Sequence, residues 1–245
     1  MKLLDVFSLK RDVKNNNTAY AVDDFESIIQ LAKDVIANTT VYQQHPIFDV
    51  VKILAQKSLA LRLVSLISSR ADFGEVDGFR YSSLLFRNSC KVKGKCINEY
   101  IWGNPIESVT DINLSCDTVL PWAWSKGRLI NSLTKIGEKK PWGEWQQMPV
   151  NHRVVLWLPM GLVWVHSGNH SISTGIIEGV GKISCEAILD ISELYDYIYF
   201  DGAYFRSKED NAIIQECLNF EFSCIFEIGR LIKNAGINYK NLQVY

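Results

Sequence analysis

The sequence lacks paired cysteines and a surplus of charge of either sign. Its 245 residues include six cysteines, at scattered positions without the CxxC spacing that a zinc site favours. Lys and Arg number 26 against 27 Asp and Glu, so net charge does not mark the whole protein as a binder of nucleic acid or anionic membranes. We therefore expect reduced thiols and no metal-site residues.

The sequence also lacks a segment that predicts export or a membrane span. Asp5 and the pair Lys10-Arg11 interrupt the start before the apolar core of a signal peptide can form. The longest apolar stretch, residues 47–67, is broken by charged side chains, which is typical of a buried helix (Asp49, Lys52, Lys57 and Arg62). We expect a cytoplasmic protein without a membrane partner.

Internal repeats and low-complexity tracts are absent as well. Hydrophobic residues make up 47% and charged residues 22% of the chain, which is the balance of a globular protein. The length fits one large domain or a helical module attached to an α/β domain. We predict an α/β (α+β) fold, with a small mixed sheet flanked by N-terminal helices and a long C-terminal helix.

The first third predicts a helical layer over residues 1–72. One helix begins with a cap at Asp23 or Asp24 and ends near Asn38. A second runs from Pro46 to about Ser69, and its broad apolar arc predicts that it is well buried (Ile47, Val50, Val51, Leu54, Leu61, Val64 and Ile67). Residues 73–119 form an irregular connecting region, because several glycines divide it into short segments (Gly74, Gly78, Gly94 and Gly103).

Residues 120–206 predict an α/β core. A helix over 125–136 carries an apolar face of Leu129, Ile130, Leu133 and Ile136. Two strands, 153–158 and 162–166, form a hairpin around residues 159–161. A helix over 172–178 and a strand over 182–189 follow. In the last segment, 207–245, an amphipathic helix over 208–235, which includes Ile214 and Cys217, packs on the core.

The turn between the second strand and its helix is the candidate site. Gly168 lacks a Cβ, so it permits a sharp turn and the close approach of a ligand. Ser171 and Ser173 lie where the helix begins, and the unpaired amides there favour an anion such as phosphate. Asn169, His170 and His166 add polar groups, and His170 is the candidate general acid or base.

Purely structural roles for the same residues stay open. Ser171 or Ser173 then caps the helix, Gly168 forms the turn and His170 is a structural histidine. We expect His152 and Arg153 to be solvated at the edge of the hairpin. The tryptophans are expected in the core, with Trp122 and Trp124 as the best candidates for stacking on a base.

The stretch over residues 164–179 reads Trp-Val-His-Ser-Gly-Asn-His-Ser-Ile-Ser-Thr-Gly-Ile-Ile-Glu-Gly. It resembles the central motif of the ParB/sulfiredoxin-like superfamily, and the chain resembles a bacterial branch of that superfamily. In that superfamily a strand ends in a G-x-H-R or G-x-x-R turn, and a short helix and another strand follow. The resemblance extends over residues 120–189. It implies a nucleotide whose phosphates lie at Gly168, Asn169, His170 and Ser171. Relatives use such phosphates for CTP hydrolysis, serine phosphorylation, sulfinic-acid repair or DNA cleavage.

Two positions depart from the motif of that superfamily. Asn169 stands where sulfiredoxins have their catalytic cysteine, which argues against repair chemistry. Ser171 replaces the usual arginine and removes a charge-assisted phosphate contact of about 1.5–3 kcal/mol. Either Arg128 or Arg153 substitutes for it, or triphosphate binding has been lost.

The sequence therefore predicts a nucleotide- or phosphate-binding protein that hydrolyses or transfers phosphate. Mg²⁺ bound with the nucleotide is the expected cofactor, and acids after the last strand are candidates to hold it, with capping and solubility as the alternative (Asp190, Glu193, Asp196 and Asp201). Two other functions stay open. One is a non-catalytic module that binds a protein partner, and the other is a metal-dependent nuclease that acts on nucleic acid.

Overall fold

A four-stranded mixed sheet forms the centre of the protein, in a computed structural model that describes residues 17–73, 81–240 and 242. Its strands are β4 (Thr118–Leu120), β5 (Arg153–Leu158), β6 (Leu162–Ser167) and β8 (Ala187–Asp190), in the order β4-β6-β5-β8. β5 and β6 form the predicted antiparallel hairpin, whereas β4 pairs with β6 and β8 pairs with β5 in parallel. The end of β6 and the start of β5 therefore lie at the same end of the sheet.

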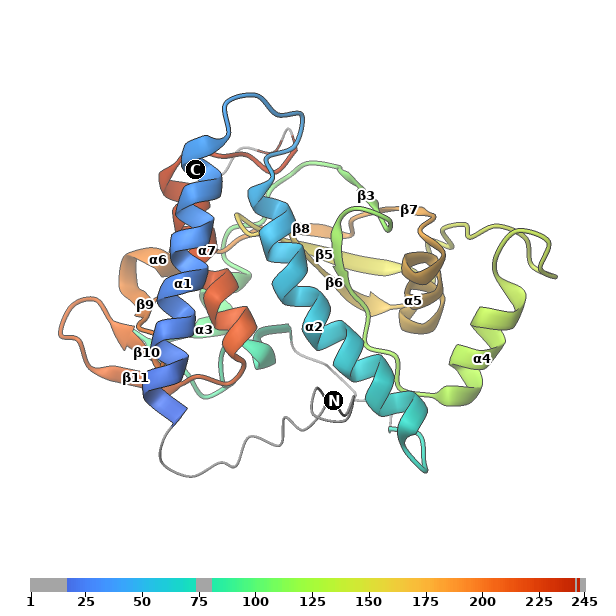
Figure 1. The fold of residues 1–245 in the computed structure, drawn as a ribbon, viewed down its shortest axis with the longest axis horizontal. Coiled ribbons are helices and arrows are strands. Elements are labelled where there is room, and N and C mark those ends of the chain that lie inside the picture. The colour runs from blue at the N-terminus through green and yellow to red at the C-terminus, as the bar shows by residue number, and fades with distance from the viewer. Residues whose placement is uncertain (1–16, 74–80, 241, 243–245) are drawn as a thin grey trace, which may run out of the picture.

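Three long helices supply much of the core that covers this sheet. α1 (Asn17–Asn38), α2 (Ile47–Ser68) and α7 (Phe220–Asn234) pack against one another, and α2 also packs on β4 (Figure 1). Asn219 caps α7 by accepting the Phe222 amide at 3.0 Å. Phe222 in turn stacks on Trp164 of β6, with ring centroids 5.4 Å apart, and so joins α7 to the sheet.

Short elements fill the predicted irregular region. They are η1 (Tyr81–Leu84), β1 (Lys91–Val92), β2 (Lys95–Cys96), α3 (Ile97–Ile101) and β3 (Asp111–Asn113). Gly94, with φ of 81°, turns the β1–β2 hairpin. Gly74 and Gly78 lie outside the described residues. The mixed α/β class predicted from the sequence is thus confirmed, and within the described residues no helix is long and apolar enough to cross a membrane.

The predicted strand over 182–189 is two strands in two sheets. β7 (Lys182–Ser184) pairs with β3, and β8 pairs with β5. The change of partner falls at Cys185 and Glu186, whose amides donate to Thr110 and Val154, respectively. The alternation of apolar residues predicts extended chain correctly over 182–189, but it does not determine which strand pairs with each part of that segment.

The C-terminal helix begins later than predicted. Ile214 belongs to β11 (Ile213–Glu216), and Cys217 follows that strand, so neither lies on α7. β11 pairs with β10 (Tyr204–Ser207), and β10 pairs with β9 (Ile198–Phe200). The short helix α6 (Leu194–Tyr197) precedes β9 in the chain. The prediction failed because a short run of apolar residues fits both helical and extended periodicities.

Other boundaries and faces also differ from the predictions. α1 begins at Asn17, before the predicted caps at Asp23 and Asp24. In α2 three side chains that were predicted to be buried lie in solvent: the exposed fractions are 58% for Leu61, 56% for Val64 and 62% for Ile67. On α4 (Lys126–Lys135), Ile130 is likewise 60% exposed. Helical spacing predicted these helices, but it did not predict which part of each apolar face packs against the core.

Candidate functional site: a cavity at the start of α5

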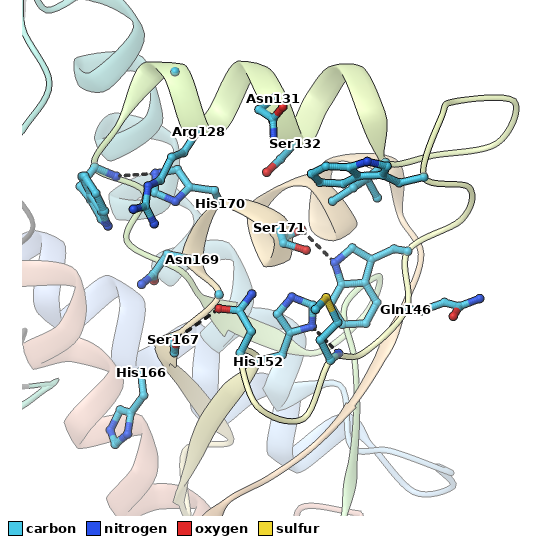
Figure 2. Close-up of a pocket in the computed structure, with 18 of the residues that line it drawn as sticks. Arg128, Asn131, Ser132, Gln146, His152, His166, Ser167, Asn169, His170 and Ser171 are labelled. Atoms are coloured by element: carbon cyan, nitrogen blue, oxygen red, sulfur yellow. Dashed lines mark hydrogen bonds between the residues drawn. The ribbon is translucent and has the colours of Figure 1, made fainter.

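A cavity of about 690 Å³ opens beside the predicted turn. It lies between α4, the start of α5 (Asn169–Glu178) and the segment over residues 142–152 (Figure 2). The structure brings six of the predicted site residues to its wall: Arg128, His166, Gly168, Asn169, His170 and Ser171. Two others, Arg153 and Ser173, are placed elsewhere.

Gly168 makes the turn that starts α5. Its φ of 82° lies in the left-handed region, which glycine adopts without strain. A Cβ at this position would also overlap Cδ2 of the His152 ring, so the backbone and the imidazole are in close contact. α5 therefore begins at Asn169, three residues before the predicted Ile172, with Gly168 as its cap residue.

The first turn of α5, which borders the cavity, contains amides that are unpaired within the helix. The first backbone bond of the helix runs from the Ile172 amide to the Gly168 carbonyl at 2.9 Å, and no described side chain caps this end. The amides of Asn169, His170 and Ser171 thus have no partner within the helix. Together with the helix dipole they form a site of partial positive charge that suits an anion.

Ser173 and Asn169 hold the turn in place. The Ser173 hydroxyl is fully buried and donates to the Asn169 carbonyl at 2.7 Å, so it is not available to a ligand. The Asn169 side-chain oxygen accepts the Trp122 amide at 2.6 Å and ties α5 to the chain after β4. Of the two predicted serines, only Ser171 borders the cavity.

His170 is held by backbone donors. Its Nε2 accepts the amides of Ser125 at 3.0 Å and Trp124 at 3.3 Å, and the Trp124 ring lies edge-on to it at 5.2 Å. Burial, and then the nearby Arg128, lower the pKa of His170 to about 4. The imidazole is therefore neutral near pH 7, with Nε2 committed as an acceptor, which favours a structural role.

His152, expected at the solvated edge, is buried in the cavity wall, so that prediction was wrong. Its side chain is 3% exposed, and its ring stacks on Trp145 with centroids 4.8 Å apart. Nδ1 accepts the Met148 amide at 2.9 Å, and burial lowers the pKa, so the neutral ring carries its proton on Nε2. Among the described residues this buried Nε2 has no hydrogen-bond partner.

The segment over residues 142–152 forms the wall that the sequence did not reveal. Trp145 donates from Nε1 to the Ser171 carbonyl at 2.9 Å and so fixes this segment to α5. Trp142 also borders the cavity and is 57% exposed, with Lys135 over its ring. The close spacing of two tryptophans and a histidine was the only local signal of this wall. Trp124 lines the cavity, so it stays a candidate for stacking on a base, whereas Trp122 packs beneath Arg62.

The two candidate arginines have different surroundings. Arg128 borders the cavity and lies over the Trp124 ring, 4.7 Å from its centroid. Arg153 is instead engaged by Glu186, with Nε 3.0 Å from the carboxylate, and it stays at the solvated edge as expected. His166 borders the cavity with Nδ1 3.6 Å from the same carboxylate. Arg128 is therefore the candidate that can replace the missing motif arginine.

The predicted magnesium ligands lie away from the turn. Asp190 ends β8, which runs parallel to β5 and hence opposite to β6, so it lies at the other end of the sheet from Gly168. Asp196 is paired with Lys233, and Asp201 with Arg206. Over the described parts of the chain, no group of three or more His, Cys, Asp or Glu side chains is arranged to hold a metal ion.

Fold and site together define a mixed α/β protein with a polar, tryptophan-lined cavity at the start of a helix. The chain belongs to a family of unknown function, DUF6710, whose model matches residues 8–239. No curated protein and no solved structure matches the chain.

Proposed function

We propose that this protein binds a phosphate-bearing small molecule in the cavity at the start of α5. The observation that carries the proposal is His152, a buried imidazole whose Cδ2 edge faces Gly168 and whose Nε2 proton has no acceptor in the described part of the chain. A buried donor without a partner costs about 1–3 kcal/mol, so such a group calls for an explanation. A bound anion that brings an oxygen to Nε2 relieves this cost.

The surrounding groups provide further donors for the same anion. The amides of Asn169, His170 and Ser171 start the helix, and the Ser171 side chain lies above the His152 ring (Figure 2). Arg128 supplies the positive charge at the cavity wall. The amides lie in the turn at which the resemblance to the ParB/sulfiredoxin-like superfamily implies a phosphate, but the proposal does not depend on that resemblance.

The geometry favours binding over acid–base chemistry by His170. Both Ser125 and Trp124 donate to the Nε2 that a general base would use, and a pKa of about 4 leaves little basicity. We therefore propose a binding protein first, with hydrolysis or transfer of phosphate as a separate proposal.

We also propose that the protein is cytoplasmic, because its free thiols suit a reducing compartment.

The test is calorimetric titration of the whole protein with inorganic phosphate at pH 7.5. We expect saturable binding that Arg128→Gln weakens about tenfold to a hundredfold, because a charge-assisted hydrogen bond is lost. Arg87→Gln is the matched control, because Arg87 is an exposed arginine that pairs with Glu216 and does not line the cavity. If the wild-type protein binds neither inorganic phosphate nor any phosphate ester, the proposal fails.

A second candidate, a module that binds a protein partner, rests on the exposed side of α2. Ile53, Leu61, Val64 and Ile67 recur at helical spacing and are each more than half exposed. Light scattering and pull-down with wild type and Val64→Lys test it: a complex that the variant loses supports the candidate, and a lone monomer without partner opposes it. No feature of the described residues favours the metal-dependent nuclease, because metal-binding side chains do not gather there.

A further inference from the structure

Charge and shape of the cavity restrict the class of ligand. Apart from the histidines, the ionisable side chains on its wall are Arg128 and Glu144, which cancel. Burial lowers the pKa of each of the three histidines that border it, so these rings add little positive charge at pH 7 (His152, His166 and His170). Positive potential near the turn thus comes from Arg128 and the start of α5, and Lys135 adds a cation only at the far end, over the Trp142 ring.

This distribution suits one phosphate group and not a chain of them. The start of a helix is equivalent to about half a positive charge, which together with Arg128 approaches the charge of a single phosphate. Among the described residues, the wall between the turn and Trp142 contains Glu144 and no further cation, so additional phosphates would lie beside a carboxylate, with Lys135 only at the far end. Uncompensated charge in a partly enclosed site is costly, so a triphosphate is disfavoured.

The cavity is nevertheless much larger than inorganic phosphate requires. Its volume of about 690 Å³ lies in the range of sites for small organic molecules. One face of α4 runs along it, from Arg128 near the start of that helix through Asn131 and Ser132 toward Lys135. Seven residues of helix span about 10 Å, so the far end of the ligand lies well away from the phosphate site.

An aromatic surface occupies this far end. Trp142 borders the cavity and is 57% exposed, and Lys135 lies over its ring, 4.9 Å from the centroid. An exposed indole offers a face on which a planar ring stacks. Between the two ends, amides and hydroxyls of Asn131, Ser132 and Gln146 offer neutral hydrogen-bonding groups.

From this arrangement we infer that the ligand is a nucleoside monophosphate, with its single phosphate at the start of α5 near Arg128 and its base on Trp142. This inference rests on the proposed function and narrows it. The inference distinguishes this cavity from a site that binds nucleoside triphosphates.

The experiment is calorimetric titration of the full chain with inorganic phosphate, the four common 5′-nucleoside monophosphates and the matching triphosphates, each with and without Mg²⁺. We expect at least one monophosphate to bind about tenfold or more tightly than inorganic phosphate and more tightly than its triphosphate. Trp142→Ala should remove this advantage and leave the affinity for inorganic phosphate unchanged, whereas Trp142→Phe should keep most of it.

Trp102→Ala is the matched control, because Trp102 is 49% exposed and follows α3, outside the cavity. The inference is overturned if a triphosphate binds as tightly as its monophosphate, or if Trp142→Ala leaves the ratio between monophosphate and inorganic phosphate unchanged. In either case binding of inorganic phosphate still supports the proposed function. If no phosphate compound binds, both fall.

Discussion

At the residue scale, the two histidines nearest the turn differ in the nitrogen that is already engaged. His170 uses Nε2 to accept two backbone amides, whereas His152 uses Nδ1 and is left with a donor at Nε2. The sequence singled out His170 because it lies two residues after Gly168, in the same turn. It could not reveal that the donors come from Trp124 and Ser125, more than 40 residues earlier in the chain.

The structural role of His170 can be tested by stability. We predict that His170→Ala lowers the free energy of unfolding by roughly 1–3 kcal/mol, because the Ser125 and Trp124 amides lose their acceptor and a buried ring is removed. Urea denaturation followed by tryptophan fluorescence measures the change. Unaltered stability together with loss of a catalytic activity would contradict this account and favour the chemical role.

At the scale of elements, the junction between β6 and α5 depends on a glycine. The G-x-H pattern placed this junction correctly, because strand alternation stops where the glycine permits a left-handed turn. The neighbour of the glycine was not predictable, because His152 reaches it across the β5–β6 hairpin. The same limit explains β11: local periodicity predicted helix there, and pairing with β10 determined strand.

Two glycines at the ends of α5 provide a matched comparison. Gly168 and Gly179 have φ of 82° and 69°, but only at Gly168 would a Cβ meet other atoms. Each alanine variant costs about 1–2 kcal/mol for the left-handed backbone. We predict that Gly168→Ala costs at least about 1 kcal/mol more than Gly179→Ala, because it also displaces the His152 ring.

Thermal and urea denaturation of the two glycine variants give this difference. Gly168→Ala should also weaken phosphate binding, whereas Gly179→Ala should leave it near the wild-type value. Equal stability and equal binding for the two variants would show that the contact between Gly168 and His152 is not important.

At the scale of the whole molecule, burial of histidine links stability to pH. The pKa of each of the four histidines is lowered by burial, for His170 to about 4 (His45, His152, His166 and His170). The unfolded chain, with a histidine pKa near 6.5, therefore binds more protons than the folded chain just below that pH. The stabilising contribution of the neutral rings is complete above about pH 6.5 and decreases as the pH falls toward the folded-state values.

We predict that the free energy of unfolding decreases by a few kcal/mol between pH 7 and pH 5 and that the histidines add little slope between pH 7 and pH 8. Urea denaturation across this range measures it. His45→Gln, which removes one buried histidine away from the cavity, should make the decrease less steep. Stability that rises on acidification would contradict the burial of these rings.

The whole fold was only partly predictable from the sequence. Composition and periodicity were sufficient for the mixed α/β class, α2, the hairpin and the start of the site. The order of the central sheet, the division of the strand over 182–189 and the wall over 142–152 depend on contacts between distant segments. The exposed apolar side chains of α2 show the same limit, since the apolar arc of this helix is wider than the part that the core covers.

The most direct test of a phosphate site at the start of α5 is an NMR titration of the ¹⁵N-labelled protein with inorganic phosphate. The account predicts that the amide resonances of Asn169, His170 and Ser171 shift together with the His152 ring Nε2 signal, and that Arg128→Gln weakens the shared binding curve. Shifts confined to other parts of the chain, or no saturable shift at these four groups, would contradict it.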